Sequence, residues 1–127
     1  MRFPDKLDVL AVHARLIAET GGRTGIRDEG LLESALAAAE NRFNYEDADL
    51  VQCAATYAYH LTQAHPFVDG NKRVAAAITE TFIESNGSEL RINDDEVVEL
   101  FLKIAAGTKS RDSVEEVLRR SIRKRNA

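Results

Sequence analysis

The sequence predicts an all-α protein of about six helices. Apolar residues recur every three or four positions along most of the chain, and residues that favour helix caps precede several of these stretches. Proline, which breaks helices, occurs only at Pro4 and Pro66, both outside the helical stretches. A chain of 127 residues is long enough for one domain with a hydrophobic core and too short for two ordinary ones. Because no repeat or linker interrupts the pattern, we expect a single domain over residues 1–127.

Two amphipathic helices are predicted in the N-terminal third. The first covers about residues 5–19, and "GGRTGIRDEG" after it has the composition of a loop. The second begins after Asp28, a good N-cap, and continues through "EGLLESALAAAENRF". The apolar positions that define these two helices are Leu7, Leu10, Ala14, Ile17, Leu32, Leu36 and Ala39.

The next two helices are predicted to form the centre of the domain. At residues 50–64 almost every side is apolar or small, and the same is true of "VAAAITETFI" at residues 74–83. The first of these helices should end at His65, because Pro66 disfavours helical backbone in the residue before it. The second should end before "NG" at residues 86–87.

Two shorter helices are predicted in the C-terminal third. "SELRIN" is expected to be a short extended connector, and Asn93 is expected to cap a helix through "NDDEVVELFLKIAAG". The last helix is predicted to start at "SVEE", where Ser113 and Glu116 have the spacing of a capping box. The apolar positions of these two helices are Val97, Leu100, Phe101, Ile104, Val117 and Leu118.

Composition excludes several classes of protein. Hydrophobic residues make up 44% of the chain and charged residues 30%, which is the balance of a folded globular protein. No apolar run is long enough for a membrane span, and the N-terminus is too charged for a secretory signal, so we expect a cytoplasmic protein without a membrane partner. The single cysteine, Cys53, cannot form an internal disulfide and is expected to be a buried small residue.

Charge argues against a general nucleic-acid-binding protein, because the formal net charge is -4. Basic residues nevertheless cluster in the tail "RRSIRKRN". Cations stabilise the negative end of a helix, so we interpret this tail as the end of the last helix, with a nucleic-acid patch as the alternative.

The stretch "HPFVDGNKR" at residues 65–73 breaks a local rule. Gly70 and Asn71 are typical of a helix start, where unpaired N–H groups carry partial positive charge, yet Lys72 and Arg73 follow at once. A bound phosphate would turn these cations into partners, because Arg73 can make forked contacts and Lys72 a point-charge contact. Two solvated cations, tolerated at a small cost, are the alternative.

His65 and Asp69 stand beside this predicted anion site. His65 can take a proton from a hydroxyl near neutral pH, although a lone histidine at a helix end can also be a cap or a packing residue. Asp69 is either the N-cap of the next helix or a ligand of Mg²⁺, which usually takes one or two carboxylates and completes its shell with phosphate and water. Phe67 is expected to point inward and anchor the loop. A base, a metal ligand and a phosphate site within nine residues together indicate function.

At this motif the sequence resembles the Fic/Doc superfamily, whose signature is His-Pro-Phe-x-Asp/Glu-Gly-Asn-Gly-Arg between two helices. Only Lys72 departs from it, where most Fic proteins have glycine. The stretches "TGGRTGIRDEGLLESALAAAENRF", "YEDADLVQCAATYAYHLTQ" and "FIESNG" are similar to the death-on-curing (Doc) branch. The resemblance implies a compact bundle with the active-site loop between two central helices. It also implies residue roles, with His65 as general base, Asp69 as magnesium ligand, and Gly70, Asn71, Lys72 and Arg73 as the phosphate site.

The resemblance further implies a reaction. Fic enzymes typically transfer AMP to a protein hydroxyl, and their glycine before the arginine leaves room for the α-phosphate. Doc toxins share "NKR", bind ATP in an inverted pose and transfer its γ-phosphate to a threonine of elongation factor Tu, which stops translation. Two departures from the Fic pattern favour γ-phosphate transfer. Lys72 replaces the glycine, and Ala76 stands where many Fic motifs carry a second arginine. We therefore expect a Doc-like kinase that uses ATP and Mg²⁺, with an AMP transferase or a non-catalytic binding module as alternatives.

Regulation by a partner is also implied by the resemblance. Doc-type toxins are usually neutralised by a small Phd-like antitoxin whose disordered C-terminal segment folds into a groove on the toxin. Many Fic proteins instead carry a Ser/Thr-x-x-x-Glu-Gly/Asn inhibitory helix, but "SNGSEL" offers Ser85 and Glu89 followed by Leu90, so we expect inhibition in trans. Four further polar residues are expected to stabilise helix ends rather than line a substrate groove: Asp28, Glu29, Glu33 and Tyr45.

Overall fold

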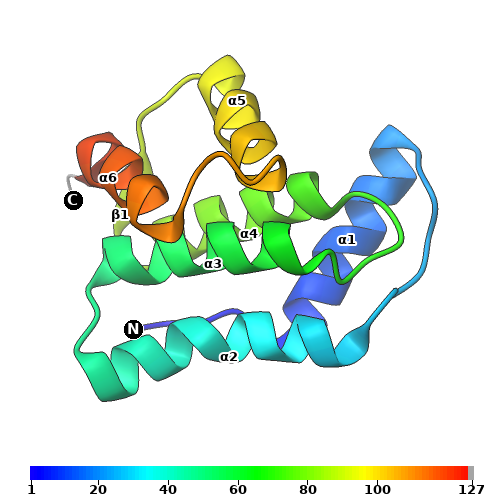
Figure 1. Cartoon of the computed structure of the whole chain (residues 1–127), viewed down its shortest axis with the longest axis horizontal. Coiled ribbons are helices and arrows are strands. Elements are labelled where there is room, and N and C mark those ends of the chain that lie inside the picture. Colours follow the sequence, from blue (N-terminus) through cyan, green and yellow to red (C-terminus); the bar gives the residue numbers. More distant parts are fainter. Residues whose placement is uncertain (126–127) are drawn as a thin grey trace.

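The computed structural model describes residues 1–125, which contain six helices and one two-stranded sheet (Figure 1). The predicted all-α class is therefore confirmed. The helices are α1 (Lys6–Thr20), α2 (Glu29–Glu46), α3 (Leu50–Ala64), α4 (Asn71–Ser85), α5 (Asp94–Ala105) and α6 (Arg111–Ser121). The strands are β1 (Ser88–Leu90), which lies in the predicted extended connector, and β2 (Ile122–Lys124).

Most helices begin at a side chain that accepts a hydrogen bond from the first turn. Asp28 accepts from the Leu31 amide at 3.0 Å, and Asn93 accepts from the Glu96 amide at 2.8 Å, as predicted for both caps. Reciprocal capping boxes begin α1, α3 and α5. Local sequence therefore sets most of the helix starts.

The predicted start of the last helix is wrong by about one turn. The N-cap is Ser110, whose hydroxyl accepts from the Ser113 amide at 3.1 Å, so Ser113 lies inside α6 and makes no capping box with Glu116. The chain turns three residues before Ser110, at Gly107, whose φ is 78°. A side chain that accepts from the third amide of the helix is sufficient to start α6 one turn earlier.

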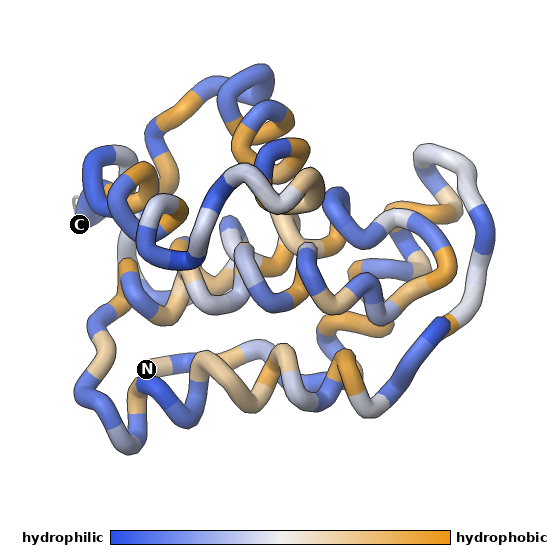
Figure 2. The backbone as a smooth tube through the Cα atoms, viewed as in Figure 1, coloured by the Kyte–Doolittle hydropathy of each residue, from blue (hydrophilic) through white to orange (hydrophobic). Residues whose placement is uncertain are grey.

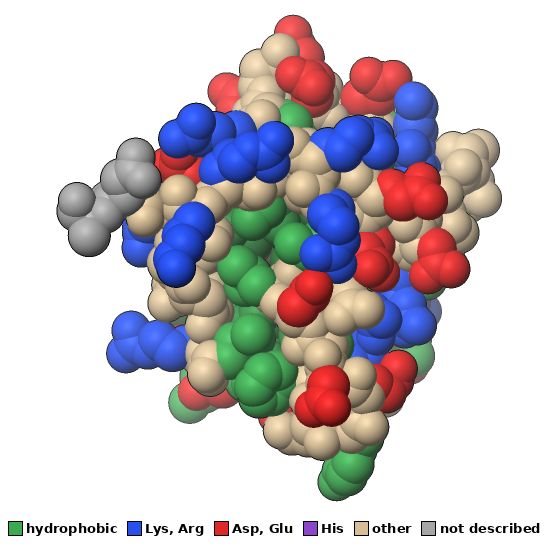
Figure 3. Space-filling view, turned by 90° about the vertical axis from the view of Figure 1, so that its left-hand side faces the viewer, with side chains coloured by type: hydrophobic (Ala, Val, Ile, Leu, Met, Phe, Trp, Pro, Cys, Tyr) green, Lys and Arg blue, Asp and Glu red, His purple; other side chains and the backbone are tan. Residues whose placement is uncertain are grey.

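The interpretation of the basic tail as a helix end holds only for its first part. Arg119 and Arg120 lie in the last turn of α6, but β2 follows and pairs antiparallel with β1 through Glu89 and Arg123. The tail cations also have structural contacts, since Arg119 binds Asp49 at 3.0 Å. On the face that carries this end of the chain, basic and acidic side chains are interspersed around a hydrophobic band (Figure 3). Asn126, the last residue of the predicted tail, lies outside the described residues.

Helix α3 lies at the centre of the bundle and packs against α2, α4, α5 and α6 (Figure 1). Hydrophobic and hydrophilic segments alternate along the helices in Figure 2, as expected where amphipathic helices share one core. The largest fully buried side chains of this core include Tyr57, Leu61, Ile78 and Phe82. The two helices predicted to be central are α3 and α4. Their packing in the core therefore fixes both ends of the loop of residues 65–70.

Cys53 is buried in this core, as predicted, and burial raises the pKa of its thiol to about 11. Among the helices of residues 1–125, none has both the length and the apolar character that crossing a membrane requires.

Candidate active site

His65 terminates α3 in a left-handed backbone conformation. Its φ and ψ are 47° and 56°, and its side chain is exposed. A residue other than glycine rarely adopts this conformation, although histidine does so more readily than most. The turn ends the helix at the predicted position, before Pro66, and presents the imidazole to solvent at the rim of the loop.

Arg27 holds this helix end. Its Nε donates to the His65 carbonyl at 2.6 Å, and its Nη2 donates to the Ala64 carbonyl at 2.7 Å. The last carbonyls of a helix have no N–H donor within the helix, and they carry partial negative charge. A guanidinium supplies both hydrogen-bond donors and positive charge there. Arg27 therefore fixes the backbone from which the His65 side chain projects.

The loop of residues 65–70 is pinned on both sides. The amides of Arg27 and Asp28 donate to the Pro66 carbonyl at 2.7 and 3.1 Å, and Ile26 forms an antiparallel bridge with Phe67. The Asn71 side chain spans the loop, accepting from the Phe67 amide at 2.9 Å and donating to the Phe67 carbonyl at 3.0 Å. The Asn71 side chain thus stabilises the loop, and its backbone amide is the part of Asn71 that belongs to the first turn of α4.

Phe67 points inward, as predicted. It is 1% exposed and stacks on the imidazole of His13, with ring centroids 3.9 Å apart. The same imidazole donates from Nε2 to the Asp69 carbonyl at 2.9 Å. His13 therefore links α1 to both the apolar anchor and the carboxylate residue of the loop.

Asp69 does not cap α4, so that alternative is wrong. The N-cap is Gly70, with a φ of 80° and no side-chain cap. The Asp69 carboxylate instead accepts from the Arg23 amide at 3.1 Å and from the Gly70 amide at 2.8 Å. These two hydrogen bonds, together with the nearby Arg73 charge, hold the pKa of the Asp69 carboxyl below its usual value. Asp69 is thus an ionised, partly exposed carboxylate beside the start of α4.

The donor set around Asp69 fits Mg²⁺ shared with phosphate. Each carboxylate oxygen accepts one backbone hydrogen bond and keeps further lone-pair capacity. Among residues 1–125 no group of three or more His, Cys, Asp or Glu side chains is arranged to hold a metal. A single carboxylate that leaves the rest of the shell to phosphate and water suits Mg²⁺.

The start of α4 offers unpaired backbone donors. Within residues 1–125, the amides of Asn71, Lys72 and Arg73 have no hydrogen-bond acceptor, and the first amide bonded in the usual way is that of Val74, to the Gly70 carbonyl at 2.9 Å. Consecutive free amides at the positive end of a helix form an anion-binding nest. These amides lie where the sequence predicts a phosphate site.

The two cations of this helix turn are placed differently. Lys72 is exposed, whereas the Arg73 guanidinium donates to the Thr20 hydroxyl and to the Gly21 carbonyl at 3.3 Å. Arg73 also lies 3.9 Å from the Asp69 carboxylate. The end of α1 thus positions Arg73, while Lys72 is free to reach a ligand.

Gly22 closes the site from the α1–α2 loop. Its φ is 120°, and a Cβ added there would lie 2.8 Å from the Asp69 carboxylate and 3.3 Å from the Arg73 guanidinium. Only glycine lets the loop approach both groups so closely. The loop predicted from "GGRTGIRDEG" therefore forms one wall of the site.

Three of the four further polar residues have contacts that support helices α1 and α2. Asp28 caps α2, and Glu29 and Glu33 both form ion pairs with Lys6 of α1. Tyr45 is 84% exposed near the end of α2. The first three have the predicted structural role.

Sequence reasoning missed His13 and Arg27. His13 occupies the buried side of α1 with Val9 and Ile17 at i, i+4 spacing, and a histidine among apolar positions is a signal of a polar partner in the core. Arg27 carries no such signal, because a single arginine in a loop is typical of a solvated side chain. Its role depends on α3 ending beside the loop in space.

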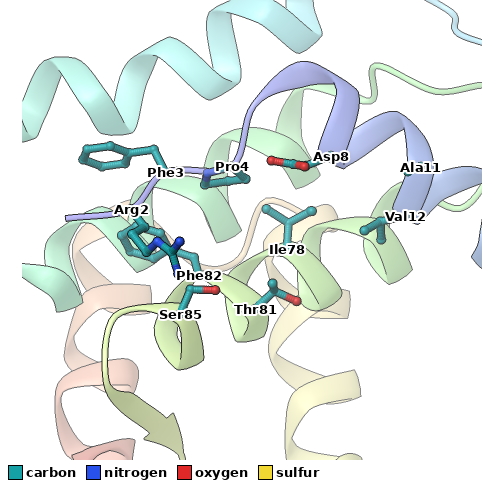
Figure 4. A pocket seen from close by; sticks show the side chains of 10 residues that line it. All are labelled: Arg2, Phe3, Pro4, Asp8, Ala11, Val12, Ile78, Thr81, Phe82 and Ser85. Carbon is teal, nitrogen blue, oxygen red and sulfur yellow. The ribbon is translucent and has the colours of Figure 1, made fainter.

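A cavity of about 530 Å³ lies on another part of the molecule, between the N-terminal segment, α1 and α4 (Figure 4). Figure 4 shows Phe3 and Pro4 on the N-terminal segment, Val12 on α1, and Ile78 and Phe82 on α4 around it. Arg2 and Asp8 stand among the polar groups of the lining. None of the lining residues belongs to residues 65–73.

The helical bundle, and the motif from His65 to Arg73 whose loop joins its two central helices, agree with the class predicted from the motif, the Fic/Doc superfamily. A family model described as the Fic/DOC family matches residues 3–83. "Protein kinase doc" of Escherichia phage P1 is 32% identical over 121 residues, which cover 94% of this chain and 95% of that relative. "Toxin Doc" of Mycolicibacterium smegmatis is 36% identical over 95 residues, covering 73% of this chain and 71% of that relative. The chain belongs to the Fic/DOC family.

Proposed function

We propose that this protein is a Doc-like toxin that transfers the γ-phosphate of ATP to a serine or threonine hydroxyl of a translation protein such as elongation factor Tu. Similarity over most of the chain to a protein named as a kinase and to one named as a toxin supports this reaction and role. The observation that carries the proposal is the start of α4, where free amides, Lys72 and Arg73 gather at the end of the short loop that begins at the exposed His65. The proposed site of action is the cytoplasm, and residues 1–127 would form a single domain.

In the proposed mechanism, the imidazole of His65 takes the proton of the acceptor hydroxyl. The hydroxyl oxygen then forms a bond to the γ-phosphorus, while the bond from that phosphorus to the β–γ bridging oxygen breaks and ADP leaves. The free amides of Asn71, Lys72 and Arg73, with the two cationic side chains, bind the negative charge of the phosphate oxygens, and Gly70, whose own amide donates to Asp69, lets the phosphate approach closely. Asp69 would hold Mg²⁺, which neutralises phosphate charge when bound.

Lys72 and Ala76 favour γ-phosphate transfer over AMP transfer. The Lys72 side chain adds bulk and charge where most Fic proteins have glycine, and Ala76 provides no second arginine for the remaining phosphates. AMP transfer remains the second candidate, because the rest of the motif is shared with Fic enzymes. A non-catalytic binding module would not need both His65 and Asp69.

The donor phosphate can be identified directly. Purified protein with Mg²⁺ is incubated with a cell extract and with ATP labelled either at the γ or at the α position. We expect a protein band that carries label from the γ position only. Label from the α position alone would replace phosphorylation by AMP transfer, and label from neither would leave a binding module.

The proposed partner is a Phd-like antitoxin that binds a groove on the toxin. The cavity between the N-terminal segment, α1 and α4 fits an amphipathic helix, because its apolar wall of Val12, Ile78 and Phe82 has the charged Arg2 and Asp8 beside it. A short neighbouring gene that encodes a protein with a disordered C-terminal segment would be the candidate.

Co-expression tests this groove. Ala11 and Ala18 are both exposed residues of α1, but only Ala11 lines the cavity. We expect Ala11→Asp to escape neutralisation by the antitoxin, whereas Ala18→Asp remains neutralised. Neutralisation of both variants would place the antitoxin on another surface.

A further inference from the structure

His13 is a buried histidine that the proposed mechanism does not use. Its side chain is 6% exposed and lies flat on Phe67, with ring centroids 3.9 Å apart and an angle of 7° between the ring planes. Its Nε2 donates to the Asp69 carbonyl oxygen at 2.9 Å, and because a carbonyl only accepts, this nitrogen carries a proton. Phe67 is 1% exposed, so close packing restricts the orientation of both rings. The packing therefore aims one fixed donor at the backbone of the loop.

The carbonyl that His13 holds and the amide that anchors the Asp69 carboxylate belong to one peptide group. The Gly70 N–H donates to the Asp69 Oδ1 at 2.8 Å, and the peptide bond between these two residues is trans. In a planar trans peptide the C=O and N–H bonds point in opposite directions. Fixing the carbonyl toward His13 therefore directs the N–H toward the carboxylate. A hydrogen bond at the carbonyl also polarises the peptide, which strengthens the N–H donor on its other side.

Glycine at position 70 makes this restraint necessary. Gly70 has a φ of 80°, and glycine adopts positive and negative φ about equally readily, so the peptide before it can flip at low cost. A flipped peptide would turn its carbonyl oxygen toward the Asp69 carboxylate and repel it. The carboxylate would then keep only its second backbone donor, the Arg23 amide at 3.1 Å. The hydrogen bond from His13 stabilises the orientation in which both donors reach the carboxylate.

We propose that His13 is a positioning residue of the phosphate-transfer site, which aims the Asp69 carboxylate at Mg²⁺ by holding the peptide between Asp69 and Gly70 in one orientation. The inference rests on the proposed function, in which Asp69 holds the metal. His13 is not itself a ligand, because its Nε2 donates to the Asp69 carbonyl. Replacing a residue that orients a metal ligand typically lowers metal affinity by about 10–100-fold. A histidine that only supports the fold would change the amount of folded protein and leave the Mg²⁺ requirement unchanged.

Two substitutions separate the hydrogen bond from the ring stacking. His13→Phe keeps a flat ring against Phe67 and removes the donor, whereas His13→Gln removes the ring and keeps an N–H donor of similar reach. We expect His13→Phe to raise the Mg²⁺ concentration for half-maximal γ-label transfer by about 10–100-fold, and His13→Gln to raise it by less than about threefold. Excess Mg²⁺ should restore the rate of His13→Phe to within about threefold of the wild-type rate, because the carboxylate is still present.

The backbone amide of Gly70 gives a second readout that requires neither ATP nor Mg²⁺. In the wild type its proton resonance should follow the titration of the Asp69 carboxyl, whose pKa lies below its usual value because the Arg23 and Gly70 amides donate to the carboxylate. In His13→Phe this resonance should move toward that of an amide without a carboxylate partner, and the midpoint of its titration should rise. In His13→Gln both should stay near their wild-type values.

The matched control is His60→Phe, the same replacement at a half-buried histidine of α3 outside the motif, which should leave the Mg²⁺ requirement and the Gly70 resonance unchanged. Circular dichroism checks folding, and His13→Leu, which also lacks the donor, replaces His13→Phe if that variant does not fold.

The outcomes distinguish this inference from the proposed function. A wild-type Mg²⁺ requirement in His13→Phe, or a loss in His13→Gln as large as that in His13→Phe, would overturn the positioning role while a γ-labelled product still supports the kinase. A wild-type protein that transfers no γ-label would overturn the proposed function and this inference together.

Discussion

The starts of α4 and α5 differ in how they treat the unpaired amides and partial positive charge of a helix N-terminus. At α5, Asn93 and Glu96 cap each other, and Asp94 and Asp95 add negative charge to the first turn. At α4 the N-cap is Gly70, no side chain caps the helix, and the first turn carries two cations. One start is satisfied from within the chain, and the other is not.

This difference teaches where to look for a ligand. The free amides and helix dipole at α4 favour an anion, and the two cations add to the same preference instead of opposing it. The α4 start is therefore less favourable by itself and more favourable with a phosphate bound. The α5 start contributes to stability and has no need of a ligand.

Removing the proposed base, His65, should have the largest effect. General acid–base catalysis contributes about 10²–10⁴-fold to a rate, so His65→Ala should lower the transfer rate by about that factor. Because the side chain is exposed, unfolding by urea should change little. The measurement is the initial rate of γ-label transfer to the purified acceptor.

The matched control for this prediction is His60→Ala. His60 is a half-buried histidine of α3 whose Nε2 lies 3.3 Å from Arg111, on a part of the helix outside the motif. This variant should keep the transfer rate within a few-fold. Growth arrest by His65→Ala equal to that by the parent would show that toxicity does not depend on this imidazole.

Giving α4 an acidic first turn should make it behave like α5. Lys72→Glu should lower the affinity for ATP by about tenfold to a hundredfold, because an attraction to phosphate becomes a repulsion. The same change should raise the free energy of unfolding of the ligand-free protein by about 0.3–1 kcal/mol, since an acid suits a helix start. Calorimetric titration measures the ATP affinity, and urea unfolding measures the free energy of unfolding. The expected result is that the first falls while the second rises.

Weakening α5 tests the other half of the comparison. Asn93→Ala removes the acceptor for the Glu96 amide and should lower the free energy of unfolding by about 1 kcal/mol. Transfer activity of the folded enzyme should stay unchanged, because α5 starts far from the loop in sequence and takes no part in the proposed phosphate contacts. A loss of activity larger than the loss of folded protein would contradict this division of roles.

The helical architecture could be predicted from sequence because it depends on local signals. Apolar spacing, the caps Asp28 and Asn93, and Pro66 after His65 each act within a few residues. The prediction failed where two local signals competed. Ser110, three residues before Ser113, is the N-cap of α6. The pairing of β2 with β1 was also not predicted, because it depends on residues more than thirty positions apart in the sequence.

The candidate site was only partly accessible to the same reasoning. The motif places His65, Asp69 and the α4 start near one another because they are close in sequence. The supports come from elsewhere, since His13 reaches Asp69 across 56 residues and Arg27 reaches His65 across 38. Such contacts follow from packing of α1 and of the α1–α2 loop against the motif, which local patterns do not encode.

The smallest expected effect concerns the Asp69 carboxylate, which links the α1–α2 loop to the α4 start. Hydrogen bonds from the Arg23 and Gly70 amides lower the pKa of Asp69 below its ordinary value of 3.8. A lowered folded-state pKa means that the carboxylate adds stability above pH 3.8, and that this stability is lost as the pH falls through the lower folded-state pKa. Asp69→Asn should therefore flatten the dependence of unfolding free energy on pH below about pH 5.

Comparison with a second carboxylate makes this effect measurable against the general loss of stability in acid. Asp112 lies on the exposed side of α6, and Asp112→Asn removes the same charge outside the motif. Urea unfolding at several pH values between about 2.5 and 6 should give a shallower slope for Asp69→Asn than for Asp112→Asn. Equal slopes would mean that the two backbone hydrogen bonds do not favour the ionised carboxylate, and the reason for regarding Asp69 as a preformed anionic ligand beside the α4 start would be lost.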